Sequence, residues 1–194
     1  MPSWRFAAPE IAWLALLAYW LVMASNVKAT ARSETYLSRF GHLGPLFLAG
    51  ALMVYPLSEP LDILNQPLFP FTLPVLVLGD VLLVAGIVIA IWARRTLGRN
   101  WSANVMQKTG HELIEGGPFR YVRHPIYSGF LLAMIGTTLL IDEWRAVLAT
   151  VIAFLAFWRK YRLEERFMLE LFGEKYVAYR ARVSALLPRI GRRP

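Results

Sequence analysis

The chain has 194 residues, of which 57% are hydrophobic, with a mean hydropathy of +0.45 and a formal net charge of +8. This apolar content lies above the roughly 45–50% of ordinary globular domains, and the length fits a single domain. The lack of cysteine excludes disulfides, thiolate metal sites and a cysteine nucleophile. In so apolar a chain, positive charge is more typical of basic loops facing anionic lipid than of a nucleic-acid surface.

Five apolar segments predict membrane helices. They lie at about residues 10–26, 43–58, 73–93, 126–141 and 145–158. A spanning helix needs about 20 apolar residues, with about 17 as the lower limit, so the first and third segments qualify and the others are short. Only Asp142 and Glu143 separate the last two segments, which indicates a tight helical hairpin.

The distribution of basic residues supports the short segments as membrane helices. The first loop, the third loop and the tail hold 19 of the 21 lysines and arginines. By the positive-inside rule, five spans then place the N-terminus outside and the C-terminus in the cytoplasm. We therefore expect an all-α integral membrane bundle of about five transmembrane helices, in a bacterial inner membrane to judge from the cysteine-free, Arg- and Ala-rich composition.

The basic tail is expected to continue the fifth helix. Apolar residues recur with helical spacing between Leu163 and Val183, and charged residues occupy the opposite face. Gly173 is expected to divide this stretch into two helices. An amphipathic helix of this kind is typical of a membrane surface or of a cap on a bundle.

A dense polar motif, R-Y-V-R-H-P-I-Y-S-G-F, covers residues Arg120–Phe130. Pro125 fits the first turn of a helix, so the fourth helix is expected to begin near His124. Arg123 and His124 would then lie at a helix N-terminus, which favours an anion. Gly129 would allow another group to approach this helix closely. The alternative is that these side chains only contact lipid headgroups, with the tyrosines as an aromatic belt.

A second charged motif, R-L-E-E-R, covers Arg162–Arg166. The predicted hairpin returns it to the side of the membrane that holds Arg123, where a carboxylate and a guanidinium can form strong charge-assisted hydrogen bonds. The alternative is solvated charge on a helix surface. Asp80, inside the third segment, suggests a function by default, but we favour a structural aspartate that faces the bundle and hydrogen-bonds to a neighbouring helix.

The ordered set of motifs resembles the isoprenylcysteine carboxyl methyltransferase family of integral membrane enzymes. The resemblance runs from Leu97 to Pro188 and rests on L-G-R-N-W-S, on G-H-E-L-I-E-G-G-P-F-R-Y-V-R-H-P-I-Y-S-G and on E-E-R-F-M-L-E-L-F-G-E-K-Y-V-A-Y. It implies one membrane domain, with N-terminal transmembrane helices in residues 1–95 and a catalytic half in residues 96–188. The family often has V-P-R where this chain has Val183-Ser184-Ala185.

The resemblance implies that S-adenosylmethionine is the methyl donor, bound in a cytoplasmic pocket formed by the third loop and the C-terminal helices. The residues implied for its adenosine are His111, Leu113 and Ile114. Those implied for its amino-acid part are His124, Tyr127 and one of the paired glutamates, for which we take Glu164. No metal is expected, because His111 and His124 lack an obvious third ligand.

For the reaction itself the resemblance implies Arg123 and Glu165 as catalytic residues, with Trp101 and Asn104 as substrate-binding residues. An isoprenoid carboxylate acceptor is already ionised and needs only a cation in line, a role that suits the fork of Arg123. A phospholipid amine acceptor would have to lose a proton, and a glutamate base would then be required. An NADPH-dependent sterol-type membrane reductase and a non-enzymatic lipid-binding scaffold remain as alternatives.

Overall fold

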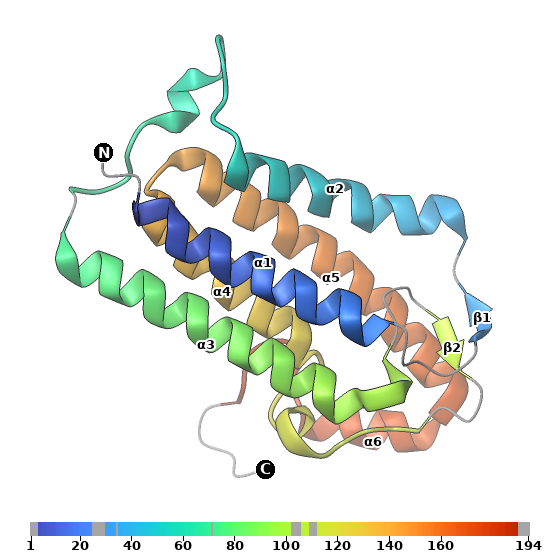
Figure 1. Ribbon diagram of the computed structural model, residues 1–194. Helices are drawn as coiled ribbons and strands as arrows, with labels where there is room; N and C mark the ends of the chain where they lie inside the picture. Colours follow the sequence, from blue (N-terminus) through green and yellow to red (C-terminus); the bar gives the residue numbers. More distant parts are fainter. Residues whose placement is uncertain are drawn as a thin grey trace.

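The computed structural model describes residues 4–24, 30–33, 35–70, 72–101, 106–108 and 112–189 as a helical bundle (Figure 1). Its α-helices are α1 (Trp4–Ala24), α2 (Tyr36–Val54), α3 (Leu73–Leu97), α4 (Pro125–Ile141), α5 (Trp144–Phe172) and α6 (Glu174–Arg182). Short 3-10 helices are η1 (Asp62–Asn65), η2 (Gly98–Asn100) and η3 (Gly117–Arg120). The antiparallel strands β1 (Thr30–Ser33) and β2 (Met106–Lys108) pair with each other.

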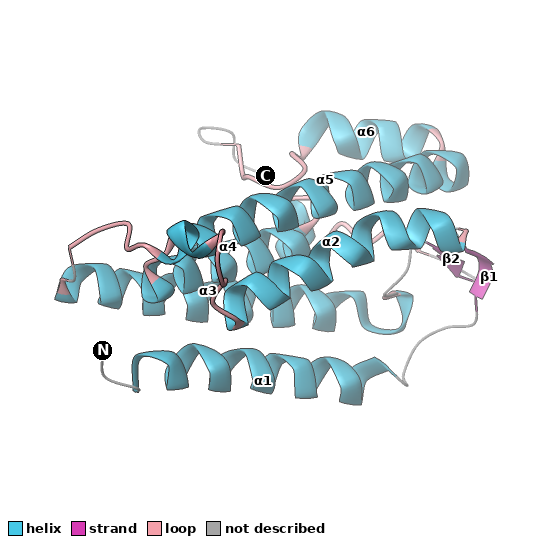
Figure 2. Cartoon of the chain, turned by 90° about the horizontal axis from the view of Figure 1, so that it is seen from above, coloured by secondary structure: helices cyan, strands magenta, loops and turns pink. Residues whose placement is uncertain are grey.

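The helices α1 to α5 lie side by side, with successive helices antiparallel (Figure 1). α3 packs along α4, and α2 packs along α5, while α4 and α5 join the two pairs. α1 lies against α3 and α4 on the outside of the bundle (Figure 2). The beginnings of α2 and α4 and the ends of α1, α3 and α5 therefore meet at one end of the molecule, next to α6.

The structure confirms most of the expected helix boundaries. α4 begins at Pro125 with His124 as its N-cap, and the α4–α5 hairpin turns at Asp142, which adopts the left-handed conformation. Gly173 separates α5 from α6 at a φ of 50°. α2 begins at Tyr36, earlier than its apolar segment suggested. The predicted all-α fold holds for the described residues apart from the short β1–β2 ribbon, which the sequence did not indicate.

By length and composition, two described helical stretches could cross a membrane: Tyr36–Val54 and Leu73–Asn100. The apolar stretches Pro9–Met23 and Pro125–Ile141 are shorter. The total of five spans therefore stays a prediction. The interpretation of Asp80 was wrong, because this residue is exposed on α3 and does not face the bundle.

At the far end of the bundle, two polar side chains attach the end of α2 and the loop after it to the α4–α5 hairpin. The Asp142 carboxylate accepts hydrogen bonds from the backbone N–H groups of Leu68 and Phe69, at 3.2 and 3.0 Å. The buried guanidinium of Arg145 donates to the carbonyl oxygen of Leu52 at 2.6 Å, at the C-terminal end of α2. Unsatisfied carbonyls at a helix end are thereby paired inside the protein.

The contact between α3 and α4 is so close that it requires glycine on both helices. A Cβ atom added at Gly86 would lie 2.4 Å from the carbonyl oxygen of Gly129, and one added at Gly129 would lie 2.6 Å from the oxygen of Gly86. Gly136, seven residues after Gly129, meets Leu83 in the same way, since its added Cβ would lie 2.4 Å from the Leu83 nitrogen. Small residues allow membrane helices to pack backbone against backbone. This contact fixes the position of α4.

We predict that Gly86→Ala destabilises the protein, because the new methyl group would force the α3 and α4 backbones apart. Overpacking of this kind costs about 1–3 kcal/mol, more than the roughly 1 kcal/mol by which alanine is the better helix former. Thermal unfolding in detergent measures the effect. Gly50→Ala on α2 is the matched control, since a Cβ there has no neighbour within 4 Å. Equal unfolding temperatures for the two variants would contradict the prediction.

Candidate functional site

The two charged motifs meet at the end of the bundle where α4 begins. Arg123 and His124 directly precede Pro125, and the α4–α5 hairpin brings Glu165 of α5 beside them. Arg123 donates from Nε and Nη2 to Glu165 Oε1, at 2.8 and 2.6 Å. His124 Nε2 lies 3.2 Å from the same oxygen. Because Glu165 is only 5% exposed, this arrangement is an internal ion pair and not solvated surface charge.

Glu164 takes part in the same cluster from the next position on α5. Its Oε1 accepts a hydrogen bond of 2.5 Å from the Tyr127 hydroxyl, and its Oε2 lies 3.6 Å from His124 Nδ1. The His124 ring therefore contacts both glutamates, one through each nitrogen. Stacking on Tyr127 and contact with Tyr161, at ring-centroid distances of 5.7 and 5.0 Å, hold the imidazole in place.

The electrostatics of the cluster favour its charged forms. Burial opposes charge on Glu165, but the hydrogen bonds from His124 and Arg123 outweigh it and lower the pKa of this carboxyl to about 2. Burial also opposes charge on His124, yet its hydrogen bonds to Glu164 and Glu165 raise the pKa of the imidazole above its usual value. The pKa of Glu164 is lowered despite burial, through the hydrogen bond to His124 and the positive charge of Lys160.

The tail after α6 folds back along the start of α4 and completes the cluster. The backbone N–H groups of Arg123 and His124 donate to the carbonyl oxygens of Ser184 and Ala185, at 2.8 and 3.0 Å. Nη1 of Arg123 donates to the carbonyl oxygen of Val183. The departure from V-P-R therefore falls in a segment that contacts the cluster through its carbonyl groups. Arg123 directs both edges of its guanidinium at protein acceptors.

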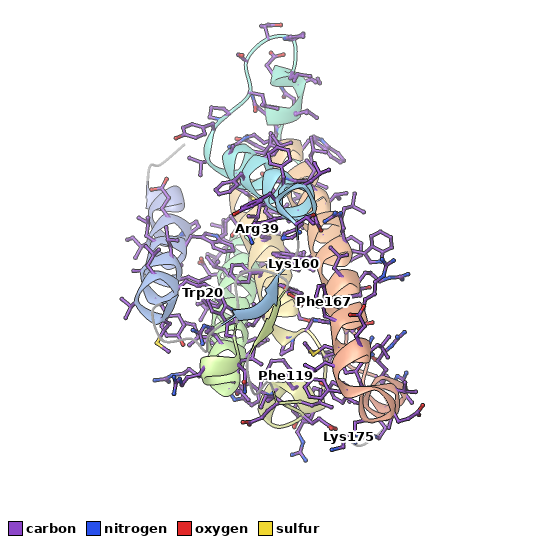
Figure 3. The ribbon with its side chains drawn as sticks, turned by 90° about the vertical axis from the view of Figure 1, so that its right-hand side faces the viewer. Trp20, Arg39, Phe119, Lys160, Phe167 and Lys175 are labelled. Atoms are coloured by element: carbon purple, nitrogen blue, oxygen red, sulfur yellow. The ribbon has the colours of Figure 1, made fainter. Side chains whose placement is uncertain are left out.

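A single cavity of about 1240 Å³ connects the cluster with an apolar compartment. Its volume exceeds the roughly 300–1,000 Å³ of ordinary small-molecule sites. The polar end is lined by Arg123, His124, Tyr127, Lys160, Glu164, Tyr176 and Tyr179. The apolar part runs between α1, α2, α4 and α5 and is lined by residues that include Trp13, Leu17, Trp20, Leu46, Met53, Phe130 and Phe157. Figure 3 shows Trp20 on α1 pointing toward the other helices.

Most of the predicted site residues come together in this cavity. Trp101, Leu113, Ile114, Arg123, His124, Tyr127 and Glu164 all line it, and Glu165 lies behind Arg123. His111 and Asn104 fall outside the described residues. Across the described part of the chain, no group of three or more His, Cys, Asp or Glu could hold a metal ion.

Sequence reasoning missed residues at the polar end of the cavity, among them Lys160, Tyr176 and Tyr179. Lys160 precedes Glu164 by four residues and therefore shares its helix face, a signal that was present in the sequence. The Tyr179 hydroxyl donates to the carbonyl oxygen of Phe119 at 2.6 Å, which ties α6 to η3. Burial raises the pKa of both tyrosines well above the usual range, so both stay neutral donors.

Comparison with known proteins identifies the family. The sequence profile of the family described as phospholipid methyltransferase matches residues 74–175, more than half of the chain. The chain belongs to this family. The match covers α3, α4 and α5, and with them both charged motifs of the cluster.

Similar proteins are named as the motifs predicted, as isoprenylcysteine methyltransferases. The chain is 30% identical over 121 residues to protein-S-isoprenylcysteine O-methyltransferase B of Arabidopsis thaliana, covering 61% of this chain and 58% of the relative. It is 32% identical over 118 residues to the protein-S-isoprenylcysteine O-methyltransferase of Saccharomyces cerevisiae, covering 58% and 48%. The predicted relationship is confirmed, although the chain spans only about half the length of these relatives.

The fold has a solved counterpart. The structure of a eukaryotic intramembrane Ras methyltransferase, an isoprenylcysteine carboxyl methyltransferase, matches with a TM-score of 0.55 and 21% identity. The match covers 82% of this chain and 55% of that protein. The chain therefore shares its helical fold with that intramembrane enzyme.

We predict that the protein loses stability as the pH rises above about 6.5, the ordinary pKa of histidine. The raised pKa of His124 contributes stability that is present below the unfolded-state pKa and is lost as the pH passes the folded-state pKa. Thermal unfolding between pH 5 and pH 9 measures the slope, and His124→Asn should flatten it. An identical slope in the variant would contradict this role for His124.

Proposed function

We propose that the protein is an integral membrane methyltransferase that moves the methyl group of S-adenosylmethionine to the carboxylate of a lipophilic, isoprenoid-type acceptor. The observation that carries this proposal is the single cavity in which a charged cluster opens directly into a long apolar compartment. A reaction between a water-soluble donor and a lipid-borne acceptor requires a site of this kind. Membership of a methyltransferase family and the isoprenylcysteine methyltransferase relatives support the same chemistry.

The residues of the cluster fit S-adenosylmethionine. When bound, this cofactor supplies an electrophilic methyl group on a sulfonium. Glu164, with His124 and Tyr127 hydrogen-bonded around it, offers a carboxylate for the cationic amino-acid part. The apolar side chains of Leu113 and Ile114 line the same cavity and suit the flat adenine. We place His111 in the adenosine part by family resemblance alone.

The site mainly has to position the reactants and exclude water. A carboxylate acceptor has a reference pKa of about 3.5, so it is ionised at neutral pH and needs no general base. Holding donor and acceptor in line supplies most of the acceleration that such a displacement requires. The ion pair of Arg123 with Glu165 gives the start of α4 one fixed position, which orients His124 and Tyr127.

The orientation in the membrane follows from charge. We propose five spans with the N-terminus outside, so that the cluster lies at the cytoplasmic face of a bacterial inner membrane. Residues 96–188 then supply the donor site. The earlier helices α1 and α2 supply much of the apolar compartment, through residues such as Trp13 and Met53. The acceptor's tail would lie between these helices, close to lipid.

We predict that the purified protein binds S-adenosylhomocysteine and not NADPH, as measured by titration calorimetry. It should also transfer a radioactive methyl group from S-adenosylmethionine to N-acetyl-S-farnesylcysteine. Binding of NADPH alone would indicate a reductase. Methyl transfer to phosphatidylethanolamine, without transfer to the farnesylcysteine, would indicate that the acceptor is an amine and not a carboxylate.

We predict that Arg123→Lys lowers methyl transfer about 10- to 100-fold. An ammonium cannot reproduce the paired contacts to Glu165, and losing charge-assisted hydrogen bonds costs about 1.5–3 kcal/mol. The control is Arg120→Lys. Arg120 is exposed on η3, so this substitution removes a guanidinium three residues away from Arg123. The readout is turnover at saturating donor, with the unfolding temperature of each variant measured in parallel. Full activity in Arg123→Lys would exclude the ion pair from the mechanism.

A further inference from the structure

The side chains that α5 presents to the cavity are, in chain order, Arg145, Ala153, Phe157, Lys160, Glu164 and Met168. Arg145 lies at the far end of the bundle and forms an ion pair with Glu143. At the end that holds the cluster, Lys160 is therefore the first charged group on α5 after the apolar side chain of Phe157. It is only 7% exposed, and Figure 3 shows it inside the molecule, whereas Lys175 of α6 lies at the outer edge.

Lys160 faces the part of the cluster assigned above to the methyl donor. Its Nζ lies 5.6 Å from the centroid of the Tyr127 ring, whose hydroxyl binds Glu164. Arg123 also lines the cavity, but its Nε and Nη2 donate to Glu165 and its Nη1 donates to the carbonyl of Val183. Arg123 is thus held on the side of Glu165 and the tail, whereas Lys160 follows Phe157 by three residues on α5 and lies on the side of the apolar compartment.

We propose that Lys160, and not Arg123, holds the acceptor's carboxylate and selects anionic over neutral or cationic acceptors. This inference rests on the proposed methyltransferase function and specifies its acceptor. An acceptor whose apolar tail occupies the compartment beside Phe157 brings its head group to the level of Lys160. An ammonium at that position supplies a charge-assisted hydrogen bond to one carboxylate oxygen and leaves the other oxygen for the reaction.

The step balances without a proton transfer. The free carboxylate oxygen forms a bond to the methyl carbon as the bond from that carbon to sulfur breaks. The electron pair of the broken bond stays on sulfur, so the products are a methyl ester and a neutral thioether. Because the ester carries no charge, it loses its attraction to Lys160, which favours its release into the membrane.

The surrounding charges agree with an anionic acceptor. The charged groups at the cluster are Arg123, His124, Lys160 and Arg180 on the positive side and Glu112, Glu164 and Glu165 on the negative side. With His124 protonated, the positive charges outnumber the negative ones by one. A carboxylate compensates this excess, whereas a protonated amine would add to it.

The test compares two ligands, N-acetyl-S-farnesylcysteine and its carboxamide, which differ only in the charge of the head group. We expect the wild-type protein to bind the acid about 10- to 100-fold more tightly than the amide, the range of one hydrogen bond to a charged group. Lys160→Met keeps most of the length of the side chain but removes the charge, and it should abolish that preference. Lys160→Arg should restore most of it, and Lys175→Met, which removes a charge outside the cavity, should leave it unchanged.

Binding of S-adenosylhomocysteine to each variant shows whether the fold and the donor site are intact. We expect this affinity to stay unchanged in Lys160→Arg, which keeps the positive charge beside Glu164. A preference for the acid that survives in Lys160→Met would overturn the inference. If this variant also loses donor binding, Lys160 belongs to the donor site. Equal affinity of the wild-type protein for acid and amide would also overturn it. Methyl transfer to the acid by the wild-type protein tests the proposed function separately, so the two failures can be distinguished.

Discussion

One carboxylate oxygen, Oε1 of Glu165, holds together three parts of the chain that lie far apart in sequence. It accepts two hydrogen bonds from Arg123 before α4 and lies within 3.2 Å of His124, while Arg123 also binds the tail through Val183. Burying an ion pair costs desolvation, so such a pair adds little net stability. Removing one partner is costly, because the other charge is then left buried and unpaired. The pair therefore specifies geometry, and His124 and Tyr127 take their positions from it.

The glycine contact between α3 and α4 gives this geometry a rigid support. Gly86 and Gly129 bring the two backbones together, so α4 cannot shift without breaking the contact. On its other side α4 faces the cavity through Tyr127 and Phe130. One helix thus joins a close-packed interface to an open compartment. α1, which lies on the outside of the bundle, covers the compartment with Trp13 and Trp20.

This combination of a fixed charged end and a wide apolar compartment is the physical basis of the proposed reaction. The charges act most strongly where little water reaches them, and the burial of His124 and Glu165 provides such a place. A lipid tail needs a long apolar surface, and the compartment between α1, α2, α4 and α5 provides that. The boundary between the two regions falls at Lys160, where the reacting groups would have to meet.

Local signals in the sequence predicted the helical elements and the two charged motifs. Pro125 fixed the start of α4, Gly173 fixed the end of α5, and two polar residues fixed the α4–α5 hairpin, because each of these signals acts over a few residues. The spacing of the motifs along the hairpin also predicted that Arg123 and Glu165 meet. Local chemistry was sufficient for these features.

The partners of these charges depend on contacts between segments that lie far apart in the chain. The engagement of Arg123 by the carbonyl of Val183 depends on the return of a tail 60 residues away. Spacing along α5 places Lys160 on the helix face of Glu164, but the packing of α1 and α2 determines that this face borders the apolar compartment. Asp80 was misjudged because the apolar sequence around it does not reveal which face of α3 packs inward. Contacts between distant segments depend on the packing of the whole bundle, and a pattern read along one helix does not contain that information.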